Sequence, residues 1–231
     1  MPPPTSDDIV GLDMMIRGQV IVPGSILYEA EAKKQHNAMY HSNKPAFYVH
    51  CKDAADIQET LKFVTKHRME LSIRSGGHSI CGSSIRNGSV VVDVGRICDV
   101  DYDESTESVT MGPGATLSDV NVHLLRRGRM TPVGVIPATG CGGLITQGGV
   151  GWLLHRYGTS VDNVIAMTIV LADGTLKELD HSSTGDDREL FFAARGAAGV
   201  LGIVTSITMR TYPMENVTGG LWAMLDDEKY S

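Results

Sequence analysis

The stretch that decides the fold is rich in glycine and serine and reads Arg74-Ser75-Gly76-Gly77-His78-Ser79-Ile80-Cys81-Gly82-Ser83-Ser84. Residues 71–74 predict a short strand that runs directly into it. Two adjacent glycines after a strand let consecutive backbone N–H groups turn toward one point, and such a nest binds a phosphate anion. Serine hydroxyl groups add donors around this point, and the imidazole of His78 is a candidate nucleophile. Taken alone, the loop also fits a tight turn with a solvent-exposed histidine.

A second glycine cluster occupies residues 134–151 and reads Gly134-Val135-Ile136-Pro137-Ala138-Thr139-Gly140-Cys141-Gly142-Gly143 and then, from residue 148, Gly148-Gly149-Val150-Gly151. Such glycine density indicates backbone that closely approaches a flat or charged ligand. Apolar residues within and beside the cluster, such as Ile136 and Trp152, are expected to hold the segment against a core. This expectation disfavours a loose surface loop.

Two common nucleotide-binding signatures are excluded. The dinucleotide fingerprint needs a third glycine, but Ile145 stands at that position after Gly140-Cys141-Gly142, and Leu154 stands there after Gly149-Val150-Gly151. No Gly-Lys dipeptide occurs in the sequence, which excludes a P-loop.

Helices and strands follow one another along the rest of the chain. A helix is predicted from the N-cap Asp53 to His67, and the β-branched run at 90–94 predicts a strand buried on both faces. The other predicted elements are a helix capped by Thr116 and Asp119, strands at 107–111, 164–171, 175–179 and 202–212, a turn at Asp173-Gly174, and a helix from Asp187 to Arg195 ended by Gly196. This order predicts an α+β fold of two lobes, residues 14–113 and 114–215, whose glycine clusters face each other. A flexible polar tail is expected at residues 1–13.

Composition excludes several classes of protein. The 231 residues are 42% hydrophobic and 20% charged, which is typical of a globular chain. A net charge of −7 repels nucleic acid and anionic membranes, and no apolar run reaches membrane-spanning length, so neither partner is expected. The four scattered cysteines indicate neither a disulfide framework nor a metal site. Without a recognisable secretory signal, a cytoplasmic location is the expectation.

Taken together, these segments resemble the FAD-binding domain of the vanillyl-alcohol oxidase and p-cresol methylhydroxylase (PCMH-type) superfamily, and within it the berberine bridge enzyme-like oxidases. The segments that carry the resemblance are 45–56, 74–78, 90–93, 134–151, 157–163, 170–174, 189–196 and 202–205. The resemblance implies a PCMH-type fold with FAD between two α+β lobes. It also implies an oxidoreductase that passes hydride from a small alcohol, sugar or amine-type substrate to the flavin, with molecular oxygen as the acceptor.

The resemblance assigns roles to individual positions. His78 matches the histidine that forms a covalent bond to the 8α carbon of the flavin, and Ile203 and Val204 match a strand edge beside the adenine half. The full set of residues expected to contact FAD is Arg74, Ser75, Gly76, Gly77, His78, Ser79, Gly82, Ser83, Pro137, Thr139, Gly140, Gly142, Gly143, Gly148, Gly149, Ile203 and Val204.

Three features differ from parts of the family pattern or limit what it implies. Doubly tethered relatives carry a cysteine where this sequence has Ile136, so no second covalent bond through a cysteine is expected. Thr139 stands where relatives limit oxygen access, and its small side chain favours oxidase behaviour. Relatives continue into a substrate domain that supplies the catalytic base; residues 216–231 are expected to begin that domain, which places the base outside this chain.

Two alternatives to a flavin oxidase are open at this point. The run from Gly77 to Cys81 nearly spells the nucleophile elbow of a serine hydrolase, with Ser79 as nucleophile and His155 or His181 downstream, although Cys81 replaces the second glycine. A fluorophosphonate probe would label Ser79 in a hydrolase. A truncated, non-catalytic flavin-binding module would have the same glycine loops as the oxidase.

Overall fold

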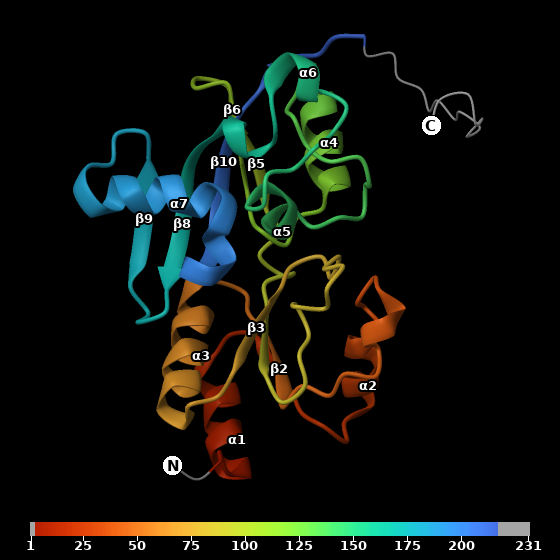
Figure 1. Cartoon of the computed structure of the whole chain (residues 1–231), viewed down its shortest axis with the longest axis vertical. Helices are drawn as coiled ribbons and strands as arrows, with labels where there is room; N and C mark the ends of the chain where they lie inside the picture. The colour runs from red at the N-terminus through yellow and green to blue at the C-terminus, as the bar shows by residue number, and fades with distance from the viewer. Residues whose placement is uncertain (1–2, 217–231) are drawn as a thin grey trace, which may run out of the picture.

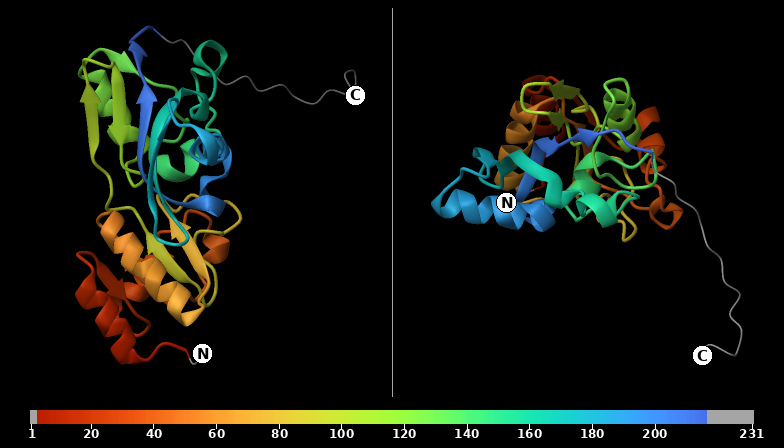
Figure 2. Two further views of the ribbon diagram at one scale, coloured as in Figure 1. Left: turned by 90° about the vertical axis from the view of Figure 1, so that its left-hand side faces the viewer. Right: turned by 90° about the horizontal axis from the view of Figure 1, so that it is seen from above.

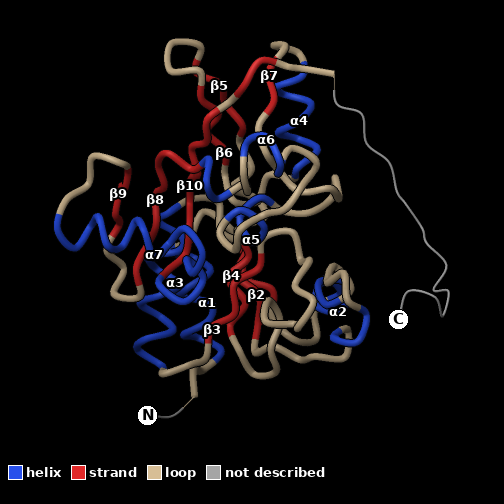
Figure 3. The backbone as a smooth tube through the Cα atoms, turned by 45° about the horizontal axis from the view of Figure 1, so that its top comes forward, coloured by secondary structure: helices blue, strands red, loops and turns tan. Residues whose placement is uncertain are grey.

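The computed structural model, which describes residues 3–216, divides into two lobes placed end to end (Figure 1). The first lobe, red to yellow in Figure 1, is built on a four-stranded sheet, and the second, green to blue, on a five-stranded sheet. Figure 3 shows these strands in separate halves of the molecule, with helix α5 (Cys141–Ile145) near the level at which the halves meet. The α+β fold predicted from the sequence is confirmed.

The sheet of the first lobe has the order β1-β2-β4-β3, with β1 (Gln19–Ile21), β2 (Phe47–His50), β4 (Val90–Asp93) and β3 (Leu71–Arg74). The last three strands run parallel. Alternate side chains of β2 and β4 enter two different cores, which explains why these strands are apolar throughout. Helices α1 (Ser6–Met15) and α3 (Ala54–His67) pack into one core, and α2 (Ile26–Ala32) packs into the other.

The expectation of a flexible tail at residues 1–13 is wrong from Ser6 onward. Helix α1 starts there because Thr5 and Asp8 form a reciprocal capping box, with the Asp8 amide donating to Thr5 Oγ1 at 3.2 Å. Leu12 then anchors the helix, since its side chain is fully buried against the first core. The polar run that suggested a tail is therefore a helix-capping sequence.

The sheet of the second lobe is antiparallel and has the order β5-β6-β10-β8-β9. Its strands are β5 (Val100–Asp103), β6 (Ser108–Met111), β10 (Gly202–Arg210), β8 (Val164–Leu171) and β9 (Leu176–Asp180). Helices α4 (Leu117–Leu125) and α7 (Gly185–Leu201) share one apolar core with this sheet. The smaller elements are the helix α6 (Leu154–Tyr157), the 3-10 turns η1 (Ala38–Tyr40) and η2 (Val161–Asn163), and the strand pair β7 (Arg129–Met130) and β11 (Tyr212–Pro213).

The predicted lobe boundary at residues 113 and 114 is wrong. Strands β5 and β6 fall inside the range predicted for the first lobe, yet β6 pairs with β10 of the second sheet, Met111 opposite Ile207. The chain therefore crosses between lobes after Asp93, before β5 begins. Which sheet a strand joins depends on a partner far along the chain, and a local pattern carries no information about that partner. The expected start of another domain at 216–231 lies outside the described residues except for Asn216.

Several other predictions are confirmed, and one needs adjusting. Helix α3 begins after its N-cap Asp53, strand β8 spans 164–171, and β8 and β9 pair as a hairpin. Helix α7 begins earlier than expected and is broken, not ended, at Gly196, whose φ is +150°. In the described part of the chain, no helix has both the length and the hydropathy needed to cross a bilayer.

The two lobes share packing as well as the chain crossing. Val170 of β8 and Ile203 of β10 bury their side chains in the core of the first lobe. The side-chain amide of Gln58 on α3 donates to the carbonyl of Gly174 at 2.7 Å, where the β8–β9 hairpin turns against that helix. Figure 2 shows this hairpin reaching down to α3. The relative position of the two glycine clusters is thus determined by packing between the lobes.

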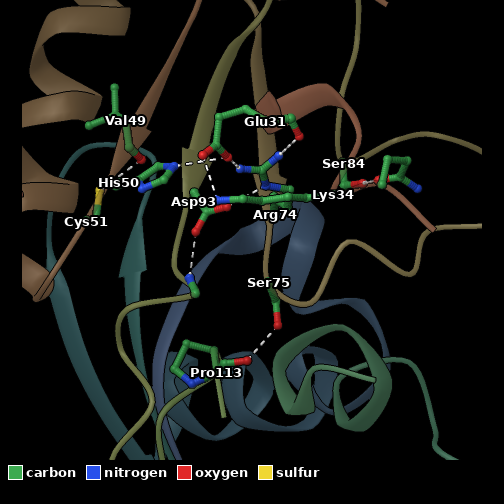
Figure 4. A network of polar contacts seen from close by, with 12 residues as sticks. Glu31, Lys34, Val49, His50, Cys51, Arg74, Ser75, Ser84, Asp93 and Pro113 are labelled. Atoms are coloured by element: carbon green, nitrogen blue, oxygen red, sulfur yellow. Dashed lines mark hydrogen bonds and ion pairs between the residues drawn. The ribbon is translucent and has the colours of Figure 1, made fainter. Parts of the chain in front are cut away.

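A buried cation, Arg74, ties three elements of the first lobe together (Figure 4). Its guanidinium bonds to the carboxylates of Asp93 on β4 and Glu31 on α2, and it donates to the Glu31 carbonyl at 2.8 Å. The ring of Tyr48 lies 4.9 Å from the guanidinium carbon. Burial opposes ionisation of Glu31, yet hydrogen bonds from His50, Lys34 and Arg74 hold the pKa of this carboxyl well below its usual range. Arg74 therefore stays charged and paired although it is only 1% exposed.

We expect Arg74→Met to lower the free energy of unfolding by about 3–5 kcal/mol, because two carboxylates would stay buried without their cation. Urea-induced unfolding at neutral pH measures this loss. The control is Lys62→Met, which removes an exposed ion pair with Glu59 and should cost less than about 1 kcal/mol. Equal losses in the two variants would contradict this account of the network.

Candidate functional site

The first glycine loop leaves β3 through a turn that only glycine fits. Gly77 has a φ of +70°, and a Cβ at this position would lie 2.6 Å from the carbonyl oxygen of Lys34. Within residues 3–216, no protein group accepts a hydrogen bond from the backbone N–H of Gly76, Gly77 or His78. These donors are therefore available to an anion, which is the property that a phosphate nest requires.

The second glycine loop packs directly against the first, as predicted from the sequence. A Cβ on Gly76 would lie 2.4 Å from the backbone nitrogen of Gly140, and a Cβ on Gly140 would lie 2.4 Å from that of Gly76. Ser75 strengthens the junction, since its hydroxyl donates to the Pro113 carbonyl at 2.6 Å. The backbones of the two glycine loops are therefore in direct contact where the two lobes join.

A groove of about 620 Å³ opens along this junction. A cavity of about 110 Å³ adjoins it and shares Ser75 and Gly143 with it. A third cavity, of about 280 Å³, borders the other side of Gly76 and Gly77. The lining of each of the three hollows includes Ser75, and the three are together called the slot. The predicted contact residues that line the groove are Ser75, Gly76, Gly77, His78, Ser79, Ser83, Thr139, Gly140, Gly143 and Gly149, and Gly142 and Val204 line the 110 Å³ cavity.

Five predicted contact residues have other surroundings. The side chain of Arg74 serves the buried ion network and borders only the 280 Å³ cavity. Gly82 packs against the ring of Tyr40, where a Cβ would lie 2.4 Å from Tyr40 Cδ1. The remaining three residues do not line the slot. Pro137 is exposed, and Ile203 is buried in the core of the first lobe. Gly148 lies in a turn, and its carbonyl oxygen accepts a hydrogen bond from the backbone N–H of Val161.

The strand-edge expectation for residues 203 and 204 holds in a restricted form. Strand β10 lies inside its sheet, but β6 pairs with it only from Ile207 onward. Over Gly202–Val204, the pairing within the described residues is with β8 alone. The free edge there adjoins the 110 Å³ cavity through Gly202 and Val204, while the side chain of Ile203 points into the core.

His78 lies in the groove with its ring half-buried and stacked on His36. The two ring centroids are 4.6 Å apart and the planes differ by 12°. Burial lowers the pKa of His78, the neighbouring His36 lowers it further, and the backbone of Ala138 opposes the shift. The imidazole of His78 is therefore neutral down to a lower pH than that of a free histidine, so its nitrogen lone pair is available to an electrophile.

The structure gives no support to a serine hydrolase. Among the described residues, Ser79 Oγ contacts Ser83 Oγ at 2.8 Å, Cys81 Sγ at 3.6 Å and the Ser83 amide at 3.1 Å. No histidine is among these partners, so Ser79 lacks the base that a nucleophilic serine requires. The histidine beside it, His78, stacks on His36 instead.

Some residues of the site carried no signal in the sequence. The wall of the 110 Å³ cavity includes Val94, Pro113 and Gly199, which reach it only through the packing of the two lobes. Gln35 and His36 contact the first glycine loop from a segment about forty positions earlier in the chain. Such pairs are invisible to local patterns.

Comparison with known proteins is consistent with this geometry. Residues 45–180, more than half of the chain, match the family described as FAD binding domain. The chain belongs to this family. An FAD-linked oxidoreductase of Aspergillus terreus is 33% identical over 95% of this chain and 44% of its own length. The crystal structure of 6-hydroxy-D-nicotine oxidase from Arthrobacter nicotinovorans is 30% identical, with a TM-score of 0.80 over 86% of this chain and 43% of that protein.

A carbohydrate oxidase of Microdochium nivale, solved with a substrate analogue, is also similar, at 29% identity and a TM-score of 0.79 over 89% of this chain and 43% of that one. The chain thus spans less than half the length of these relatives. By their names, these two relatives are oxidases of 6-hydroxy-D-nicotine and of carbohydrate. The predicted family and fold are confirmed.

We expect Gly76→Ala to lower the free energy of unfolding by about 1–3 kcal/mol and to reduce the amount of FAD that the protein takes up, because its Cβ would force the two glycine loops apart. Thermal unfolding and flavin absorbance after gel filtration measure the two effects. Gly11→Ala is the control: a Cβ there meets no atom within 4 Å, and alanine in helix α1 should stabilise by up to about 1 kcal/mol.

Cys81 offers a second test of the groove. Hydrogen bonds from the side chains of Ser79 and Ser83 lower the pKa of its thiol to about 7. Iodoacetamide should therefore modify Cys81 at a rate that rises with pH and is half-maximal near pH 7. In Ser79→Ala the midpoint should move to higher pH, as followed by peptide mass spectrometry. An unchanged midpoint would show that the serine hydroxyls do not stabilise the thiolate.

Proposed function

We propose that this chain is the FAD-binding part of an oxidoreductase that holds its flavin in the slot between the lobes through one covalent bond to His78. The observation that carries the proposal is the half-buried imidazole of His78 on the wall of the groove, next to a turn whose backbone N–H groups have no acceptor within residues 3–216. Burial also lowers the pKa of this imidazole, which favours its neutral, nucleophilic form. FAD would supply hydride acceptance from the substrate and electron transfer to molecular oxygen.

The shape and chemistry of the slot suit an extended dinucleotide. The free N–H groups of Gly76 and Gly77 can hold the pyrophosphate, and close backbone approach is possible because these glycines present no side chain. Gly202 and Val204 border the 110 Å³ cavity, which suits the adenine end. The groove at His78 has the largest volume of the three hollows, about 620 Å³, and suits the ring system.

A single covalent bond agrees with the cysteines near the site. Cys141 of the second loop is buried, and burial raises the pKa of its thiol to about 12, so it cannot supply a thiolate. Ile136 stands where doubly tethered relatives have a cysteine. Cys81 does line the groove, so it is the residue that the experiment must separate from His78.

The activity proposed for the whole protein is oxidation of a small alcohol, sugar or amine-type substrate, with oxygen as the acceptor. The oxidase names of the relatives support this choice, and so does the small side chain of Thr139 on the groove wall. Within residues 3–216, the titratable side chains that line the groove are those of His78 and Cys81. Because His78 is committed to the flavin, we assign the catalytic base to the part that the relatives have beyond the matched residues.

The purified protein should be yellow, and its flavin absorbance should remain with the pellet after acid precipitation. His78→Ala should still bind FAD through the slot but release it into the acid supernatant. His155→Ala, which removes an exposed histidine outside the groove, is the matched control and should retain the covalent flavin. Flavin that stays with the His78→Ala pellet would indicate attachment at another residue, with Cys81 the first to examine.

A second measurement separates catalysis from a non-catalytic flavin module. Hydrogen peroxide release and bleaching of the flavin absorbance are followed with panels of alcohols, sugars and amines, using the full-length protein. Reduction of the flavin by one class supports the oxidase. A stable yellow protein that no class reduces would support the non-catalytic module.

A further inference from the structure

The main chain on both sides of His78 is held by one dipeptide, Gln35-His36. The backbone N–H of His36 donates to the Gly77 carbonyl at 2.8 Å, and the side-chain amide of Gln35 donates to the Ser79 carbonyl at 2.6 Å. The accepting carbonyls belong to the residues immediately before and after His78. Neither hydrogen bond follows from the local sequence of the glycine loop, because the donors come from the segment after helix α2.

The ring of His78 is held by the same dipeptide. The imidazole of His36 stacks on it with 4.6 Å between centroids and 12° between planes. A nitrogen lone pair of an imidazole lies in the ring plane, so a partner on the ring face fixes the orientation without using that lone pair. The stacking of His36 therefore does not occupy the in-plane nitrogen lone pair of His78, whose ring lies on the groove wall.

The dipeptide is itself firmly anchored. Gln35 is 1% exposed, its side-chain oxygen accepts from the Ser84 hydroxyl at 2.6 Å, and its carbonyl contacts the ring of His41 at 2.7 Å. Four residues earlier, Glu31 on α2 bonds to buried Arg74. The position of His78 is thus connected through Gln35-His36 to the rigid ion network of the first lobe.

We infer that Gln35-His36 is a positioning element for the covalent attachment of FAD, with His36 orienting the imidazole of His78 toward the flavin. The inference rests on the proposed function. Attachment replaces one C–H bond of the flavin 8α methyl group and the N–H bond of His78 by a C–N bond. The two protons and two electrons released pass to dioxygen, which becomes hydrogen peroxide. The contribution of His36 is orientation, and a misplaced nucleophile is expected to react about 10- to 100-fold more slowly.

The experiment follows covalent attachment separately from FAD binding. Each protein is produced under riboflavin limitation and then incubated with FAD in air; attached flavin is quantified by in-gel fluorescence after denaturation, and bound flavin by gel filtration. We expect His36→Ala to bind FAD and keep its melting temperature, while attachment slows at least about tenfold. His36→Phe preserves a flat stacking partner and should restore most of the rate, a rescue that a general structural defect would not show.

Met39→Ala is the matched control, since Met39 is 79% exposed in the same segment and should not affect attachment. Attachment in His36→Ala at the wild-type rate would overturn the positioning role, and so would a His36→Phe protein as slow as His36→Ala. A wild-type protein that releases all its flavin on denaturation would instead overturn the proposed covalent bond, and this inference with it. The wild-type protein alone therefore tells failure of the covalent-bond proposal from failure of the positioning role, because it keeps its flavin on denaturation only if the covalent bond exists.

Discussion

The ion network around Arg74 is the interaction on which the site depends most directly. It stands at the end of β3, where the chain leaves the sheet for the first glycine loop, and it links β3 to β4 and α2 through Asp93 and Glu31. The side chains of Glu31, His50 and Asp93 come within 4.8 Å of one another, a spacing that would also suit a metal ion. The guanidinium already supplies the positive charge there, and two carboxylates keep it buried. A rigid strand end is the result.

A second constraint is steric and acts between the lobes. Gly76 and Gly140 approach so closely that a side chain on either would displace the other loop. This contact needs both lobes to be packed, since Val170 and Ile203 of the second lobe enter the core of the first. The slot for FAD therefore lies along a junction of bare main chain, where donors can reach a dinucleotide without side chains in between. The same junction brings His78 beside the second loop.

The function that these features support is flavin chemistry, and they disfavour a serine hydrolase. A serine hydrolase needs a histidine at Ser79, whose described partners are Ser83 and Cys81. A non-catalytic module shares every feature of the slot, so it differs from the oxidase only in turnover. Membership of the FAD binding domain family, together with oxidases among the similar structures, supports the proposed oxidase over the non-catalytic module.

The sequence by itself determined the elements whose signals are local. The Asp53 cap and the apolar spacing behind it predicted α3, the β-branched run predicted β4, and the two glycine clusters predicted facing loops. Local patterns also mislead: the capping box of α1 resembles a polar tail, and no local signal indicates which lobe β5 and β6 join.

Only the tertiary structure determined which side chains lie in or support the site and which are buried in the core. Arg74 pairs with Glu31, Ile203 fills the core of the other lobe, and Gln35-His36 holds His78 from a segment about forty positions earlier in the chain. The physical reason is the same in each case. A cap, a turn or a strand pattern is set by neighbours along the chain, whereas a buried ion pair or a stacked ring is set by a partner that only folding brings near.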